Sequence, residues 1–135
     1  MPIGVVGLGL MGSSIVVSLL AAGYRVIALA PVPGERKTAA VHIGELINHM
    51  AEADLLKPSI QSCIDSLMLV EDYGALSDCK LVLECVVEDK EIKKSVYHKI
   101  AAVVSSDAVI ASNTSAIPIS ELQQLVPNPD RFLGI

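Results

Sequence analysis

Residues 3–20 read IGVVGLGLMGSSIVVSLL, and the predicted fold class follows from this segment. It begins with the apolar run Ile3–Val6 and passes through the glycine-rich hexapeptide Gly7–Gly12, which reads GLGLMG. A helix pattern over Met11–Leu20 follows at once. Since a GxGxxG turn between a strand and a helix is typical of dinucleotide-binding domains, the stretch predicts such a strand–turn–helix unit.

The three glycines have different predicted roles. Gly7 lets the strand turn sharply, Gly9 lets a pyrophosphate approach the backbone, and Gly12 lets the helix pack close to the strand. Phosphates would then meet free N–H groups and the positive end of a helix dipole. Glycine-rich turns also occur for packing alone. The strand pattern Arg25–Leu29, which follows the helix stop at Ala22 and Gly23, completes a strand–helix–strand unit and favours the dinucleotide interpretation.

The rest of the chain alternates between strand and helix patterns. Helical spacing of apolar residues covers Glu35–Glu52 and residues 92–104, and a short helix is predicted over Ile119–Leu125. Further strands are predicted over Ser66–Val70, Leu81–Val87, Ala108–Ala111 and Phe132–Ile135, with a turn or short helix over Asp72–Asp78. Six strands with helices between them predict an α/β fold, a doubly wound and mostly parallel sheet of the Rossmann type.

Composition narrows the classes of partner. The chain has 135 residues, enough for one domain, and its 52% apolar content suits strands buried on both faces of a parallel sheet. The net charge is −5, aromatic residues make up 3% and tryptophan is absent, which argues against nucleic acid and anionic membranes as partners. A small molecule or another protein is the expected partner.

Targeting and cysteine usage indicate a reducing compartment. No apolar run has the length of a membrane span, and the first twenty residues lack a basic signal region. We therefore expect a cytoplasmic location, with an organelle matrix as the alternative. Cys63, Cys79 and Cys85 are odd in number and lack CxxC spacing, which predicts reduced thiols in packing roles.

One face of the Glu35–Glu52 pattern carries possible metal ligands. His42, Glu45, His49 and Glu52 share that face, but a solvated helix surface has the same composition, so no metal site is predicted. The ligand crevice of a doubly wound sheet lies at the carboxyl ends of its strands. The segments that follow strands are therefore the candidates to face it: Gly7–Gly12, Ala30, Glu88-Asp89 and Ser112–Ser115.

Four stretches carry a family resemblance: GLGLMGSSI from Gly7, ECVVEDKEIKKSV from Glu84, ASNTSAIPISEL from Ala111 and PDRFLGI from Pro129. With them the chain resembles, over essentially its whole length, the NAD-binding domain of the 3-hydroxyacyl-CoA dehydrogenases. The resemblance implies oxidation of the C3 hydroxyl of a fatty acyl-CoA, or reduction of the ketone, by hydride exchange with NAD.

The resemblance also implies site residues. Glu88 and Lys93 would line the dinucleotide near its nicotinamide half, and Ser115 would contact nicotinamide and substrate as the catalytic candidate. A hydroxyl can hydrogen-bond the reacting oxygen, and a lysine offers donors to ribose or phosphate oxygens, so both suit orientation rather than proton abstraction. The implied cofactor-binding set is Gly7, Leu8, Gly9, Leu10, Met11, Gly12, Ala30, Glu88, Lys93, Asn113 and Ser115.

Two of these residues keep an alternative interpretation. Ser115 could be the N-cap of the helix predicted after Pro118, and Lys93 could be a solvated helix residue.

Position 30 departs from the usual pattern. Dinucleotide sites usually carry an Asp or Glu at the end of the second strand, where the carboxylate accepts hydrogen bonds from the ribose hydroxyls. Ala30 can neither bind the ribose nor repel a 2′-phosphate. Arg36 or Lys37 could reach a phosphate if the Pro31–Gly34 loop folds back, so NAD is the expected cofactor and NADP is not excluded.

In the resembled family a catalytic His, paired with a Glu from a following helical domain, comes after the sixth strand. We expect residues 1–135 to be the cofactor-binding domain without that helical substrate and dimerisation domain, and to be inactive alone. His42, His49 and His98 lie on helix patterns away from the predicted crevice. The complete protein is expected to be a homo-oligomer acting on an acyl-CoA or another 3-hydroxy acid.

The substrate assignment carries alternatives. The family also uses basic side chains on the helix after the second strand to hold CoA, where Val41–Asp54 offers His and Glu instead of Lys. The alternatives are an NAD(P)-dependent β-hydroxyacid dehydrogenase domain and a non-catalytic nucleotide-binding module.

Overall fold

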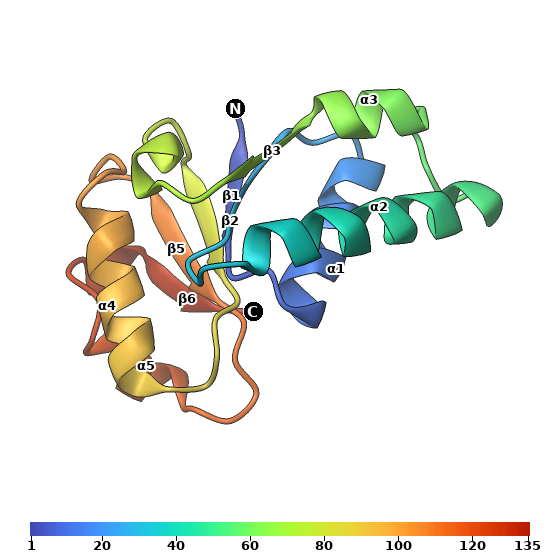
Figure 1. Cartoon of the computed structure of the whole chain (residues 1–135). Coiled ribbons are helices and arrows are strands. Elements are labelled where there is room, and N and C mark those ends of the chain that lie inside the picture. Colours follow the sequence, from blue (N-terminus) through green and yellow to red (C-terminus); the bar gives the residue numbers. More distant parts are fainter.

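A fully parallel sheet of six strands forms the centre of the computed structural model, which describes all 135 residues (Figure 1). The strands are β1 (Ile3–Val6), β2 (Val26–Leu29), β3 (Leu67–Val70), β4 (Leu81–Glu84), β5 (Val109–Ser112) and β6 (Phe132–Gly134). Their order across the sheet is β3-β2-β1-β4-β5-β6. This is the Rossmann order, so the predicted fold class is confirmed. The order in which the chain adds strands to the sheet reverses between β1 and β4, and such folds bind ligands at this switch point.

Helices cover both faces of the sheet. The structure contains α1 (Leu10–Ala21), α2 (Glu35–Glu52), α3 (Ile60–Asp65), α4 (Lys90–Ala101) and α5 (Ile119–Gln123), with 3-10 turns at Tyr73–Leu76 and Pro129–Arg131. In Figure 1, α1 and α2 lie on one side of the sheet and α4 and α5 on the other. The strands are consequently buried from both sides, as their continuous apolar runs predicted.

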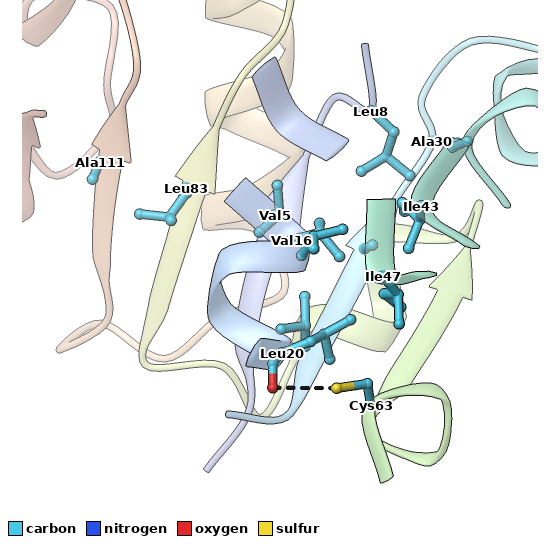
Figure 2. Packing of buried hydrophobic residues seen from close by; sticks show 14 residues of the cluster. Val5, Leu8, Val16, Leu20, Ala30, Ile43, Ile47, Cys63, Leu83 and Ala111 are labelled. Atoms are coloured by element: carbon cyan, nitrogen blue, oxygen red, sulfur yellow. Dashed lines mark hydrogen bonds between the residues drawn. The ribbon is translucent and has the colours of Figure 1, made fainter. Parts of the chain in front are cut away.

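Strand register divides the core into two layers. Val5 pairs with Ala28 on one side and with Leu83 on the other, and Leu83 pairs with Ala111. This row packs against α1 and α2 in one cluster, which Figure 2 shows together with Val16, Leu20, Ile43 and Ile47.

The next row along the strands faces the opposite helices. Val6 pairs with Leu29 and with Glu84, and Glu84 pairs with Ser112. The apolar members of this row belong to the second cluster, beneath α4. The rings of Tyr97 on α4 and Phe132 on β6 meet edge to face there, with centroids 5.3 Å apart. Glu84 and Ser112 thus point into a layer that is otherwise apolar.

Two elements differ from the sequence prediction. Helix α3 was not predicted; Ser59 begins it, with a side chain that accepts a hydrogen bond from the Ser62 N–H. The strand predicted over Leu81–Val87 ends at Glu84. The Glu84 carboxylate accepts the Val86 N–H at 2.9 Å, which turns the chain away from the sheet, and Val87 is 64% exposed. The other predicted elements are confirmed, with some ends shifted by a few residues.

Candidate functional site

The glycine turn links β1 to α1. Gly7 has φ +97°, and a Cβ there would lie 2.7 Å from the backbone of Cys85. A Cβ on Gly12 would lie 1.8 Å from the Gly7 carbonyl oxygen. The sharp turn at Gly7 and the close packing at Gly12 are therefore confirmed, because a larger side chain at either position would displace backbone atoms.

Gly9 stands in a different environment. A Cβ on Gly9 would meet no atom within 4 Å, so packing does not require a glycine there. The first backbone hydrogen bond of the helix runs from the Ser13 N–H to the Gly9 carbonyl at 2.9 Å. The preceding N–H groups therefore have no partner within the helix, and no side chain caps this end. With no acidic residue in the first turn, the start of α1 can receive an anion.

A cavity of about 480 Å³ opens beside the glycine turn. It lies at the carboxyl ends of β1 and β4, and apolar side chains dominate its walls, among them Val32, Val86, Val87 and Ile92. Gly7, Leu8 and Gly9 border it on one side. Its size and largely apolar lining are those of a small-molecule site.

Glu35, the first residue of α2, contacts the glycine turn directly. Its side-chain Oε1 accepts the Leu8 backbone N–H, a contact between residues 27 positions apart. Glu35 and Tyr73 both border the cavity. Burial, and after it the charge of Glu35, raises the pKa of the Tyr73 hydroxyl. Sequence reasoning missed Glu35, which it treated only as the start of a helix.

Ala30 lies in the core. It is 2% exposed, its N–H donates to the Val70 carbonyl, and it belongs to the cluster that contains Leu8 and Ile43 (Figure 2). Pro31 and Val32, rather than Ala30, border the cavity.

Arg36 and Lys37 do not border that cavity; they border a separate hollow together with Leu69 and Glu71 on the β3 side. Arg36 forms an ion pair with Glu71 at 3.6 Å. The Pro31–Gly34 loop therefore does not fold back to bring either cation to the glycine turn.

A buried polar network lies at the ends of β4 and β5. The Glu84 carboxylate accepts hydrogen bonds from Lys93 Nζ at 2.6 Å, Tyr97 Oη at 2.6 Å and Ser112 Oγ at 2.7 Å. All four side chains are buried. Burial, and after it the hydrogen bond to Glu84, raises the pKa of the Tyr97 hydroxyl well above its usual range. Sequence reasoning missed Glu84, Tyr97 and Ser112 as partners.

Lys93 occupies the centre of this network. Its ammonium also lies 3.4 Å from the Val86 carbonyl oxygen and 3.7 Å from a carboxylate oxygen of Glu88. The side chain is 0% exposed, so the alternative interpretation of Lys93 as a solvated helix residue is wrong. The signal was present in the sequence, because Lys93 shares helical spacing with the buried residues Val96, Tyr97 and Ile100.

The segment 112–115 lies beside the loop that follows β4. The Thr114 hydroxyl donates to Glu88 at 2.6 Å and accepts the Ile117 N–H, while the Asn113 N–H donates to the Glu84 carbonyl. Helix α5 begins at Ile119 without a side-chain cap, so the alternative of Ser115 as its N-cap is wrong. Ser115 is exposed. The structure thus brings Glu88, Lys93 and the 112–115 segment to one end of the sheet.

The histidines occupy different places. His98 and His49 are exposed on their helices. His42 lines a second hollow, of about 620 Å³, together with Leu8, Gly9 and Leu10. Helix α2 packs beside α1 and places His42 on the outer side of the glycine turn, but none of the three histidines borders the cavity of about 480 Å³ at the strand ends.

The sequence of the chain matches a known protein family over nearly its whole length. The family described as "3-hydroxyacyl-CoA dehydrogenase, NAD binding domain" matches residues 2–135. The chain belongs to this family. The resemblance inferred from the sequence is confirmed, and NAD is the family's cofactor.

Individual proteins are similar to the chain over almost its whole length. A 3-hydroxybutyryl-CoA dehydrogenase of Bradyrhizobium diazoefficiens is 33% identical over 98% of this chain and 46% of that protein. The 5-formyl-3-hydroxy-2-methylpyridine 4-carboxylate 5-dehydrogenase of Mesorhizobium japonicum is also 33% identical, over 98% of this chain and 43% of that protein. The crystal structure of FadB2 from M. tuberculosis has a TM-score of 0.90 and 34% identity, and covers 98% of this chain and 47% of that chain.

The chain spans about half the length of the curated relatives that it matches. None of its helices is both long enough and apolar enough to cross a membrane. Its three cysteines are free, as their spacing predicted.

Proposed function

We propose that this chain is the cofactor-binding part of an oxidoreductase that interconverts 3-hydroxyacyl-CoA and 3-oxoacyl-CoA by hydride exchange with NAD(H). One observation carries the proposal. The uncapped start of α1, the apolar cavity and the cluster around Glu88 all lie at the carboxyl ends of strands next to the switch point.

The residues present fit a dinucleotide. The N–H groups of Gly9, Leu10 and Met11 would hold the pyrophosphate, and Val32, Val86, Val87 and Ile92 would enclose the adenine. Bound NAD would supply or accept the hydride.

The other half of the cofactor would lie toward the ends of β4 and β5. Glu88, whose side chain is 35% exposed, would border the nicotinamide half together with Asn113, and the buried Lys93 would act by holding Glu88 in place. The exposed Ser115 hydroxyl would hydrogen-bond the reacting oxygen of the substrate and orient it.

The proposal extends to the complete protein. Its substrate would be an acyl-CoA or a related 3-hydroxy acid, supported by relatives named 3-hydroxybutyryl-CoA dehydrogenase. The exposed side chains of Leu10 and Met11, 78% and 59% accessible, support a homo-oligomer or a further domain that covers them. The free cysteines support a reducing compartment such as the cytoplasm.

Residues 1–135 alone would bind cofactor without turnover. The reaction needs a general acid or base at the substrate oxygen, and His is the side chain most often used. His98 is an exposed residue of α4 whose ring nitrogen contacts the Lys94 carbonyl, and no histidine of the chain borders the cavity beside the glycine turn. We therefore place the proton-transfer group outside this chain.

The experiment has two arms. Titration of the chain with NADH, followed by nicotinamide fluorescence, should show saturable binding. A chimera that joins residues 1–135 to the second half of the Bradyrhizobium relative should then reduce acetoacetyl-CoA with NADH, whereas residues 1–135 alone should not. A folded chimera that binds NADH and leaves acetoacetyl-CoA unreduced would overturn the proposed activity while leaving the cofactor site in place.

A further inference from the structure

We infer that Glu35 binds the adenosine ribose of the cofactor in place of an acid at position 30, and that it thereby selects NAD over NADP. The inference rests on the proposed cofactor site. It assigns the ribose to a residue outside the usual position, because the position that usually carries the ribose acid holds the buried Ala30.

The first support is the position of the carboxylate. Glu35 comes 23 residues after Gly12, close to the spacing of about 20 residues at which dinucleotide folds place their ribose acid. Its Oε1 accepts the Leu8 N–H inside the glycine turn, which fixes the carboxylate against that turn. Glu91 is the other acid that borders the cavity, and it has no hydrogen bond to the turn.

The second support is the path that the ligand must take. A pyrophosphate at the start of α1 and an adenine between Val32 and Val86 are joined through the adenosine ribose, so this sugar must pass the edge of the cavity that Leu8 and Glu35 share. Only one oxygen of Glu35 is engaged by the protein, because Oε2 has no protein partner. Carboxylate oxygens accept hydrogen bonds, and the adjacent 2′- and 3′-hydroxyls of a ribose are the donors that suit them.

The third support is the charge around this edge. A 2′-phosphate carries negative charge and no donor for the Glu35 carboxylate, so the two would repel. Arg36 pairs with Glu71 and borders a different hollow. Lys99, the cation that borders the cavity, lies over the Tyr73 ring, with Nζ 5.6 Å from its centroid. The site therefore favours a free ribose over a phosphorylated one.

The test compares protein variants of residues 1–135 with one another, each against three dinucleotide ligands. Dissociation constants for NADH, NADPH and 2′-deoxy-NADH, which lacks the adenosine 2′-hydroxyl, are measured for the wild type, Glu35→Gln and Glu91→Gln. Glu91→Gln is the matched control, because it removes the same charge from the same cavity without touching the glycine turn. Thermal melting of each variant confirms that it is folded.

We expect the wild type to bind NADH at least about tenfold more tightly than NADPH or 2′-deoxy-NADH, the size of one charged hydrogen bond. In Glu35→Gln these differences should shrink to about two- to threefold, whereas Glu91→Gln should keep them. If the wild type and both variants show the same preference among the three ligands, Glu35 does not have this role. NADH binding in that case would still support the proposed function. A wild type that prefers NADPH would also overturn the role, and binding of no dinucleotide would overturn the site and the role together. Should Glu35→Gln fail to fold, a wild type that binds 2′-deoxy-NADH as tightly as NADH would itself overturn the inference.

Discussion

The ammonium of Lys93 and the carboxylate of Glu84 lie 2.6 Å apart, and neither side chain is exposed. The pair ties the first turn of α4 to the end of β4. Tyr97 and Ser112 donate to the second oxygen of the same carboxylate, which extends the link to β5. Because a buried charge is costly unless it is paired and hydrogen-bonded, this network should hold the loop between Glu84 and Lys93 in one conformation.

Loss of the buried cation should destabilise the domain strongly. Lys93→Met leaves the Glu84 charge buried without its counter-ion, and we expect the free energy of unfolding to fall by about 3–5 kcal/mol. Urea denaturation measures this change. Lys94→Met is the matched control, since Lys94 is an exposed neighbour on the same helix and should cost less than about 0.5 kcal/mol. Equal losses for the two variants would contradict the structural role of Lys93.

Substitutions at two glycines of the turn should have different effects, one on stability and the other on NADH binding. Gly12→Ala places a Cβ 1.8 Å from the Gly7 carbonyl oxygen and should destabilise the domain by about 3 kcal/mol or more. Gly9→Ala meets no atom, and Gly9 has a φ of −70° that alanine accepts. Gly9→Ala should therefore keep a melting temperature near that of the wild type and bind NADH more weakly, as calorimetric melting and NADH titration would show. Unchanged NADH affinity in Gly9→Ala would place the pyrophosphate elsewhere.

The Cys85 thiol should be unreactive at neutral pH. Burial, and after it the Glu84 carboxylate, raises the pKa of the thiol to about 12 from a usual value of 9.0. Alkylation of the folded protein by iodoacetamide, mapped by mass spectrometry, should therefore leave Cys85 unmodified at pH 8. The urea-unfolded chain, in which the thiolate forms readily, should react at the same pH. Rapid modification of Cys85 in the folded state would contradict the raised pKa of this half-buried thiol.

The same pKa sets a dependence of stability on pH. Below pH 9 the thiol is protonated in both states, so its contribution is fully present. Between pH 9 and about 12 the unfolded chain loses this proton while the folded chain keeps it, so the free energy of unfolding falls as the pH rises. Denaturant midpoints at pH 8, 9.5 and 11 should decline less steeply in Cys85→Ala than in the wild type. Parallel declines would show that Cys85 does not titrate abnormally.

The hydrogen bond from Thr114 to Glu88 should couple the two loops of the site. Thr114→Val keeps the side-chain shape and removes the donor, so Glu88 loses its partner at 2.6 Å. We expect a loss of about 1 kcal/mol in stability and weaker NADH binding. Ser120→Ala, at an exposed position of α5, is the control and should leave both unchanged. A Thr114→Val variant that binds NADH like the wild type would remove Glu88 from the cofactor site.

Local patterns made the glycine turn and the parallel sheet predictable. The roles of Gly7 and Gly12 depend on neighbours within the turn and on the loop after β4, and the GxGxxG spacing encodes these contacts. The alternation of apolar strands with amphipathic helices was sufficient for the parallel sheet, because few topologies satisfy that order.

The polar contacts could not be predicted, because their partners lie far apart along the chain. Glu84 stands inside an apolar run, and its partners follow 9, 13 and 28 residues later, so only the register of β4 with β5 and the docking of α4 reveal them. Glu35 reaches a backbone N–H that lies 27 residues before it. Helical spacing alone could have indicated that Lys93 is buried, but not which carboxylate it meets.

NAD should bind across the switch point between β1 and β4, and amide chemical shifts of the isotopically labelled chain would locate the bound cofactor. On addition of NAD, we predict the largest shifts at Gly9, Leu10 and Met11, accompanied by Val86 and Val87 at the cavity wall. Saturating shifts confined to another face of the domain, or no shifts at millimolar NAD, would contradict the account.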